Sequence, residues 1–158
     1  MSRQTINNTF TLNIPDSFEH MSSTELNELS RQGGDPYRWG VRDREKHIMF
    51  VVLWKQVPAI LGWLADLNGI VKRNEQLTRK AYANHDYQLR KFDSMQAGKV
   101  RAEGYQFSYS VQGIKQNVTN FLVKDGKIVY SFMWVSREVN MAEDQALFHE
   151  VMESLQHV

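Results

Sequence analysis

The chain has 158 residues and a formal net charge of +1, so as a whole it is not strongly attracted to nucleic acid or to membrane surfaces. It contains no cysteine, which excludes disulfides, thiol catalysis and thiolate zinc sites. Eight Phe, six Tyr, four Trp and seven Met can fill a hydrophobic core, and we expect one domain over residues 1–158.

The first residues predict a strand and then a short helix. Residues 10–14 alternate apolar and polar side chains and are followed by Pro15, which is typical of a strand that ends there. Ser22 and Glu25 form a capping box, in which each side chain satisfies a free amide at the start of a helix. The segment 33–36 is expected to end this helix.

The segment YRWGVRDREKHIMFVVLWK, residues 37–55, predicts a hairpin with strands at 39–42 and 47–55. Apolar residues occupy both faces of the second strand, which should therefore be central and covered on both sides. Acidic residues alternate with the basic residues of the turn, so we interpret most of this cluster of basic side chains as the solvated end of the hairpin. The alternative is a contact surface at Tyr37, Arg38 and Arg42.

The next segment predicts a helix from Pro58 to Lys80. Its apolar stripe repeats at helical spacing through Ile60, Leu64, Leu67 and Val71. Gly69 leaves open whether this helix is continuous. Trp63 widens the stripe; core packing is favoured for it, and the alternative is a groove for a partner's amphipathic helix.

Four strands are predicted in the second half, at 87–94, 105–111, 117–123 and 128–136, and Asp-Gly at 125–126 suits a tight turn before the last. The aromatic face of the strand at 105–111 should pack against a covering helix rather than stack on the bases of single-stranded nucleic acid. The last strand is apolar on both faces and should be central.

A final helix is predicted after Asn140, which should cap it together with Glu143. Its buried side is expected to be Ala142, Leu147, Phe148, Val151, Met152 and Leu155. Strands joined by short turns form an antiparallel sheet, and strands with apolar residues on both faces must be covered on both sides. The predicted fold class is therefore α+β, a three-layer α/β/α sandwich around an antiparallel sheet of about six or seven strands.

No constellation of residues predicts catalysis, a cofactor or a metal. The chain lacks a G-x-S-x-G elbow and the glycine-rich phosphate loops of nucleotide-binding proteins. His149 and Glu153 are one helical turn apart, but a single such pair is typical of a solvated helix face. We therefore expect a protein that is not an enzyme and that has no cofactor.

Four segments resemble a known family. They are FTLNIPDSF at 10–18, AGKVRAEGYQFSYSVQG at 97–113, FLVKDGKIVYSFMWVS at 121–136 and ALFHEVMESL at 146–155. Their order is similar to that of the PsbP-like superfamily, which includes the photosystem II extrinsic subunit, a Ran-binding nuclear import factor and many small bacterial proteins. These are packing and turn motifs, so they bear on the fold far more than on the function.

The resemblance implies a scaffold that mainly binds other proteins, and it supplies no catalytic residues. One bacterial branch of the superfamily serves as chaperones for type VI secretion effectors, holding their apolar transmembrane helices. The expected function is a non-catalytic protein-binding module of a small bacterial protein. The alternatives are an effector-binding chaperone or adaptor of a type VI-like secretion system and a small-ligand-binding domain.

Four residues are predicted to form the partner-binding surface: Tyr37, Arg38, Arg42 and Trp63. The expected partner is another protein, with an apolar helix of an effector or a second copy of the chain as options, and nucleic acid is not expected. The N-terminal ten residues lack the apolar segment of a secretory signal, and the apolar stretch 48–54 is too short to span a bilayer. A cytoplasmic location is the corresponding expectation.

Overall fold

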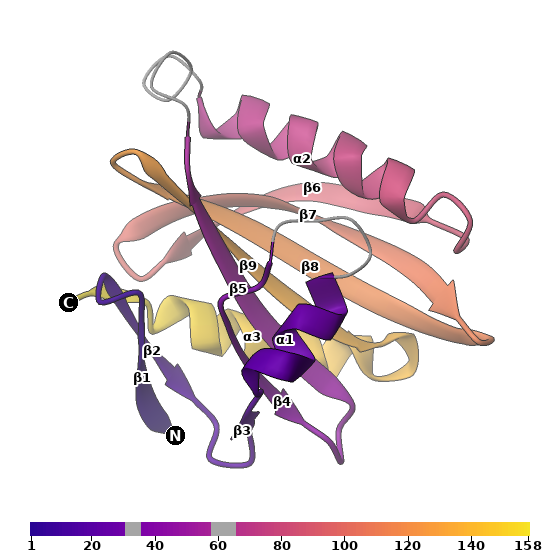
Figure 1. Cartoon of the computed structure of the whole chain (residues 1–158), viewed down its shortest axis with the longest axis horizontal. Helices are drawn as coiled ribbons and strands as arrows, with labels where there is room; N and C mark the ends of the chain where they lie inside the picture. Colours follow the sequence, from indigo (N-terminus) through magenta and orange to yellow (C-terminus); the bar gives the residue numbers. More distant parts are fainter. Residues whose placement is uncertain (31–35, 58–65) are drawn as a thin grey trace.

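The structure is a computed structural model that describes residues 1–30, 36–57 and 66–158 (Figure 1). Its strands are β1 (Ser2–Ile6), β2 (Phe10–Ile14), β3 (Glu19–His20), β4 (Trp39–Asp43), β5 (Ile48–Gln56), β6 (Gln88–Ala97), β7 (Val100–Val111), β8 (Ile114–Asp125), β9 (Ile128–Arg137) and β10 (Gln156–His157). Its helices are α1 (Ser23–Ser30), α2 (Leu67–Ala81) and α3 (Met141–Glu153), and a short 3-10 turn, η1 (Glu138–Asn140), precedes α3.

Seven strands form one antiparallel sheet in the order β3-β4-β5-β9-β8-β7-β6, and β1, β2 and β10 form a second, smaller sheet. Helices α1 and α2 lie on one face of the large sheet, and α3 lies on the other together with the small sheet (Figure 1). This arrangement confirms the predicted three-layer α+β sandwich around a seven-stranded antiparallel sheet.

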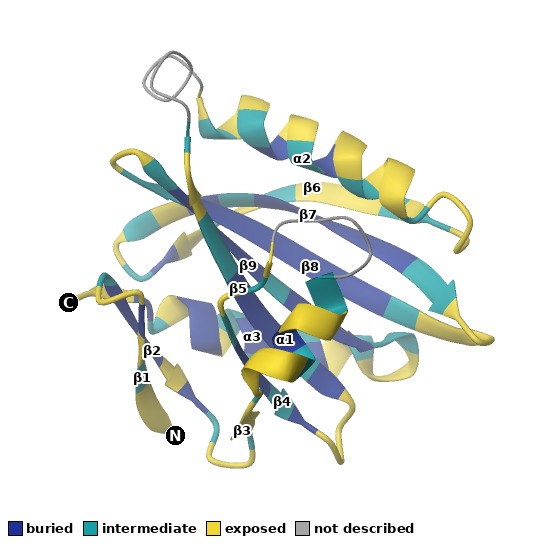
Figure 2. Cartoon of the chain, viewed as in Figure 1, coloured by how far each residue is buried: buried dark blue, intermediate teal, exposed yellow. Residues whose placement is uncertain are grey.

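The two strands predicted to be central lie side by side in the middle of the sheet. β5 pairs with β4 on one side and with β9 on the other, and β9 continues the pairing to β8. On the α3 face, Phe50 and Trp134 are fully buried, and their ring centroids lie 5.5 Å apart. Both rings pack against Phe148 of α3. Figure 2 shows the resulting buried band through β9, β8 and β7.

Helix α1 begins with the predicted capping box. The Ser22 amide donates to Glu25 Oε2 at 2.8 Å, and the Glu25 amide donates to Ser22 Oγ at 3.2 Å. On the inner side of α1, Leu26 packs closely over Gly40: a Cβ added to Gly40 would lie 2.9 Å from Leu26 Cδ2 and 3.0 Å from Val51 Cγ1. The helix therefore covers the β4–β5 part of the sheet.

Helix α2 begins later than the sequence pattern predicts. Asp66 is its N-cap, with an extended backbone and an Oδ1 that accepts the Gly69 amide at 2.7 Å. The helix therefore starts at Leu67 rather than Pro58, and it continues through Gly69 without a break. The expected turns before Asp66, with Trp63 on them, lie outside the described residues.

Two details of the α3 prediction are wrong. Ala142 is exposed because it lies on the outer side of the first turn, where Asp144 is the buried residue. Asn140 occupies the N-cap position but makes no side-chain capping hydrogen bond. Phe148, Val151, Met152 and Leu155 are buried as predicted, and Leu147 is partly buried.

A polar row lies beneath the start of α3. Ser108, Asn117 and Ser136 are fully buried neighbours across β7, β8 and β9. Asp144, 6% exposed, lies over this row from α3. Burial, followed by the charge of Glu143, raises the pKa of Asp144 above its ordinary value. The carboxylate form of this residue is therefore disfavoured by the fold.

This pKa shift predicts how Asp144→Asn changes stability. A raised pKa in the folded state gives stability at pH values below the unfolded pKa, and this contribution is lost as the pH rises through the folded pKa. The free energy of unfolding of Asp144→Asn, measured relative to the wild type, should therefore be higher at pH 7 than at pH 3. Urea unfolding at both pH values measures this, with Glu150→Gln on the exposed side of α3 as the control. If Asp144→Asn changes the free energy of unfolding by the same amount at both pH values, the raised pKa of Asp144 is contradicted.

Two glycines with the same backbone angle separate conformational strain from steric overlap. Gly98 and Gly126 both have φ of +59°, but a Cβ on Gly98 would lie 1.8 Å from the Leu155 carbonyl oxygen, whereas Gly126 has open space. Gly126→Ala should cost about 1–2 kcal/mol because of the left-handed backbone alone. Gly98→Ala should cost about 1–3 kcal/mol more, because the β6–β7 turn must move off the end of α3. Equal urea midpoints for the two variants would show that this close contact does not constrain the fold.

Candidate functional site

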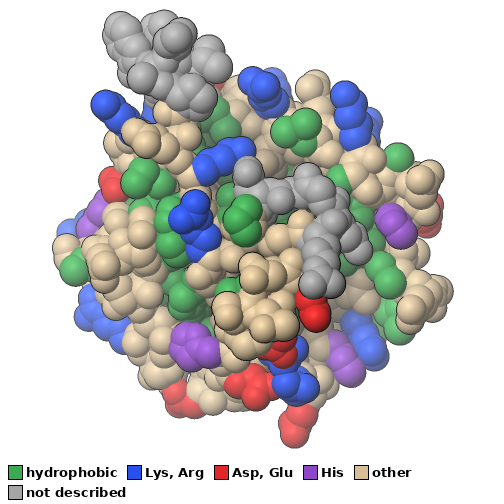
Figure 3. Space-filling model, viewed as in Figure 1, with side chains coloured by type: hydrophobic (Ala, Val, Ile, Leu, Met, Phe, Trp, Pro, Cys, Tyr) green, Lys and Arg blue, Asp and Glu red, His purple; other side chains and the backbone are tan. Residues whose placement is uncertain are grey.

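Apolar and aromatic side chains remain partly exposed between α1 and α2, most of them on the central strands β5 and β9. We call this surface the open face and define it by Tyr37, Met49, Leu53, Tyr109 and Met133. Leu53 belongs to it because it pairs with Ser131, whose side chain points toward α2. Figure 3 shows hydrophobic and basic side chains beside one another over β5 on this side of the molecule. Methionines suit such a surface because their flexible side chains adapt to different partners.

Tyr37 is fixed at the edge of the open face. Its hydroxyl donates to Met133 Sδ at 3.4 Å, and its amide donates to Ser30 Oγ at 3.1 Å at the end of α1. Burial raises the pKa of Tyr37 well above its ordinary value, and the nearby Tyr82 and Tyr109 add to this shift. Tyr37 is therefore a neutral, half-buried part of an aromatic and methionine surface.

A polar network holds α2 at its position on the sheet. The Tyr105 hydroxyl lies 2.6 Å from Asn74 Oδ1 and 2.7 Å from Thr78 Oγ1, both on α2. Asn120 on β8 donates to the same Asn74 oxygen at 3.2 Å and accepts from Ser131 on β9 at 2.7 Å. Burial raises the pKa of Tyr105 to about 12. The network connects the helix to three strands and fixes one border of the open face.

The two flanks of α2 differ in chemistry. On one flank, buried Glu75 accepts hydrogen bonds from Arg79 at 2.7 Å and from Tyr87, just before β6, at 2.9 Å. Leu77 lies about 160° around the helix from Arg79 and is 58% exposed. Since the Glu75 flank faces β6 at the edge of the sheet, Leu77 lies on the flank toward the open face.

The structure places the predicted residue Arg42 in an ion-pair network. Arg42 bonds Glu25 of α1 and lies 3.6 Å from Glu19 of β3. Arg44 also pairs with Glu19 and lies 3.9 Å from Glu25. Two arginines and two glutamates thus neutralise one another and attach α1 and β3 to β4. The acids of this network are 17 and 25 residues from their partners, so the sequence pattern did not reveal them.

Arg38 differs from Arg42 because it makes no ion pair with another described residue. Its guanidinium lies 5.7 Å from the ring centroid of Trp54, a cation–π contact, and its amide donates to the Val52 carbonyl at 3.0 Å. Arg38 is exposed next to Tyr37, at the edge of the open face. The structure therefore brings Tyr37 and Arg38 together and separates Arg42 from them, while Trp63 lies outside the described residues.

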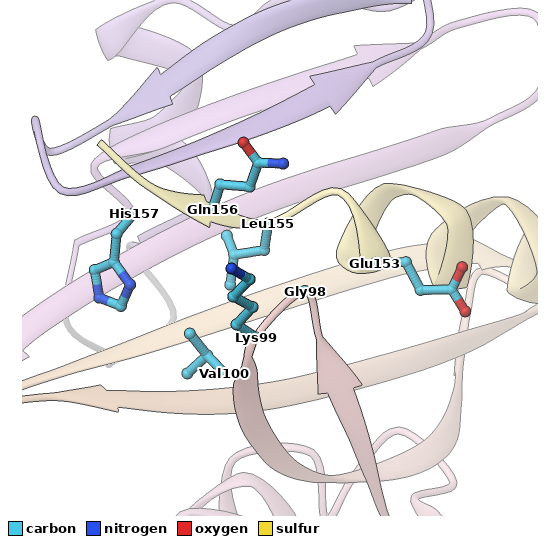
Figure 4. Close-up of a pocket in the computed structure, with 7 residues that line it drawn as sticks. All are labelled: Gly98, Lys99, Val100, Glu153, Leu155, Gln156 and His157. Carbon is cyan, nitrogen blue, oxygen red and sulfur yellow. The ribbon is translucent and has the colours of Figure 1, made fainter.

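A cavity lies where the β6–β7 turn meets the segment that follows α3. It has a volume of about 570 Å³ and is lined by Gly98, Lys99, Val100, Glu153, Leu155, Gln156 and His157 (Figure 4). In Figure 4 the Lys99 side chain extends toward β10, whereas the Glu153 carboxylate points away from it. His157 Nε2 lies 3.2 Å from Asp125 Oδ1. The polar groups of the lining do not converge on one point.

Two further observations concern the described residues alone. They contain no group of three or more His, Cys, Asp or Glu side chains placed to hold a metal ion. No helix within these residues has the length and apolar character needed to cross a membrane.

The fold and the open face together define an α+β scaffold with one sheet face that the described helices cover incompletely. More specifically, the chain has the PsbP-like fold, as its solved structural neighbours show. No family model matches the sequence, and no curated protein matches it either. The resemblance in the sequence motifs is thus confirmed at the level of the fold.

Three solved structures illustrate the similarity. Cyanobacterial PsbP (CyanoP) from Synechocystis sp. PCC 6803 has a TM-score of 0.71 at 12% identity, covering 99% of this chain and 92% of CyanoP. LpqN of Mycobacterium tuberculosis, involved in cell envelope biogenesis, has a TM-score of 0.61 at 14% identity, with 94% and 83% covered. The immunity protein TplEi of the Pseudomonas aeruginosa T6SS, complexed with an "L" peptide, has a TM-score of 0.51 at 14% identity, with 75% and 46% covered.

The network that positions α2 can be tested with two tyrosines of β7. Tyr105→Phe removes a hydroxyl bonded to Asn74, Thr78 and Asn120, and it should cost about 1–3 kcal/mol of unfolding free energy. Tyr109→Phe should cost less than about 0.5 kcal/mol, because its hydroxyl has no hydrogen bond to another described residue. Urea unfolding measures both, and equal losses would mean that the network does not hold the helix.

Proposed function

We propose that this protein is a non-catalytic protein-binding module that holds an apolar segment of a partner protein on the open face. The observation that carries the proposal is the partial exposure of the apolar side chains Met49, Leu53 and Met133 on central strands, because a solvated face of an antiparallel sheet is normally polar. Exposed apolar surface between polar borders is typical of a site for another molecule.

The geometry of the site favours binding over chemistry. The phenols of Tyr37, Tyr82 and Tyr109, at or beside the open face, have raised pKa values and stay neutral at physiological pH. Neutral phenols and thioethers supply contact area and adaptable packing, whereas general acid–base catalysis requires a group that titrates near neutral pH. These features support a partner-binding role.

A more specific proposal is an effector-binding chaperone or adaptor of a type VI-like secretion system. The sequence motifs resemble a superfamily with such a branch, and a structurally similar immunity protein of a type VI system has been solved with a peptide. A toxin or secretion-spike gene next to the gene for this protein would support this role. An operon of metabolic enzymes would instead favour a small ligand in the cavity at Lys99.

The proposal predicts that a charge placed at the border of the open face removes the partner. We expect affinity purification from the native host, read by mass spectrometry, to recover a protein partner with the wild type and to lose it with Leu77→Asp. Both Leu77 and the control position Val139 are exposed, at 58% and 86%, so neither Leu77→Asp nor Val139→Asp should unfold the chain. Val139 lies on η1, which leads into α3 on the opposite face.

Val139→Asp should therefore keep the partner. A partner retained by Leu77→Asp would contradict binding on the open face. A metabolite that co-purifies in place of any protein would contradict the proposed function and would favour the small-ligand alternative. Light scattering of the purified chain would show whether a second copy is the partner.

A further inference from the structure

Basic side chains border the open face along α2. Arg73 and Lys80 lie four residues before and three residues after Leu77, so all three are neighbours on one side of the helix surface. The three side chains also line a hollow of about 540 Å³ on the outside of α2, together with Glu75, Gln76 and Arg79. The border of the open face at α2 is therefore an exposed leucine between two cations.

These two cations are not neutralised within the described part of the chain. Arg73 and Lys80 are exposed and make no ion pair with another described residue. Arg79 on the opposite flank of the helix is different, because the buried carboxylate of Glu75 binds it. Arg73 and Lys80 thus place positive charge beside Leu77, whereas exposed Lys72 lies on the flank of Arg79.

Within the described residues, the acids at the α1 side of the open face are largely neutralised. Glu19 and Glu25, which lie at the α1 end, are bound by arginines of β4 and of the turn that follows it. Glu28 lies two residues beyond buried Leu26 and therefore points to the outer side of α1. Figure 3 shows acidic side chains gathered around the α1 end and basic side chains along α2. A ligand on the open face thus meets a basic border at α2.

We propose that the partner segment is an apolar stretch of a protein flanked by acidic residues, which pair with Arg73 and Lys80. This inference rests on the proposed function, because it describes the chemistry of the segment held on the open face. Arg73 and Lys80 are seven residues apart, which corresponds to about 10 Å along the helix axis. Two acids spaced seven residues apart on a partner helix match this distance, with apolar residues between them facing Leu77.

The test uses two synthetic helical peptides with the full-length protein. Both carry the same leucine-rich face, and they differ only in bearing a pair of glutamates or a pair of lysines seven residues apart. At low salt we expect the glutamate peptide to bind about tenfold more tightly than the lysine peptide, by fluorescence anisotropy. The difference should shrink as NaCl is added, because the charges are exposed to solvent.

Charge reversal assigns the preference to named residues. The double variant Arg73→Glu with Lys80→Glu should reverse the order of the two peptides. The matched control, Lys99→Glu with Lys115→Glu, makes the same change in net charge at two exposed lysines outside α2, and it should keep the original order. A preference that both double variants weaken equally would reflect net charge alone and would overturn the inference.

The remaining outcomes separate this inference from the proposed function. If Leu77→Asp removes binding of both peptides but the α2 double variant leaves their order unchanged, the acidic flank is wrong and the open face still binds protein. If neither peptide binds the wild type, both proposals fail. If duplex DNA or phosphatidylglycerol vesicles bind Arg73 and Lys80 more tightly than the glutamate peptide does, the basic border serves another class of partner and the inference is wrong.

Discussion

Strands β5 and β9 pair with each other through the middle of the sheet and carry large apolar side chains on both faces. Such a pair is stable in water only if both faces are covered, so the remaining elements are arranged as two covers. On one face the cover is dense, because Phe148 of α3 packs on Phe50 and Trp134 and strand β2 closes the rest. On the other face α1 and α2 lie apart, and the apolar strip between them is the open face. The same requirement that creates the fold thus creates its binding surface.

The incomplete cover follows from how the two helices are attached. Leu26 packs α1 over Gly40, where the missing side chain makes room for it. By contrast, a polar network centred on Asn74 and Tyr105 attaches α2 to β7, β8 and β9. Hydrogen bonds depend on direction as well as distance, so this network favours one position of the helix on the sheet. The open face is therefore a consequence of specific polar contacts rather than of a shortage of apolar residues.

Local and periodic signals made much of the fold predictable. The two-faced strands, the Ser22–Glu25 capping box and the Asp-Gly turn at 125–126 all depend on residues close in sequence. The two-residue strands β3 and β10 escaped prediction because they exist only through pairing with distant strands. The candidate site was harder to predict from the sequence, because its residues also come together only through long-range contacts. Tyr37 and Arg38 were predicted and lie at its edge, whereas Met133 contacts Tyr37 from 96 positions away and was assigned only to a strand face.

The distribution of charge around the open face is informative because the chain as a whole is nearly neutral. A net charge of +1 gives little long-range attraction, so any electrostatic selection has to act over short distances at the site. The Arg42–Glu25 pair neutralises one cation and attaches α1 to β4, and the Arg79–Glu75 pair neutralises another cation within α2. The cations that remain beside the open face have no ion pair within the described residues. Exposed cations beside an apolar surface favour partners with acids at matching positions. Selection among partners can therefore come from a few unpaired side chains on a scaffold whose other charges are used for folding.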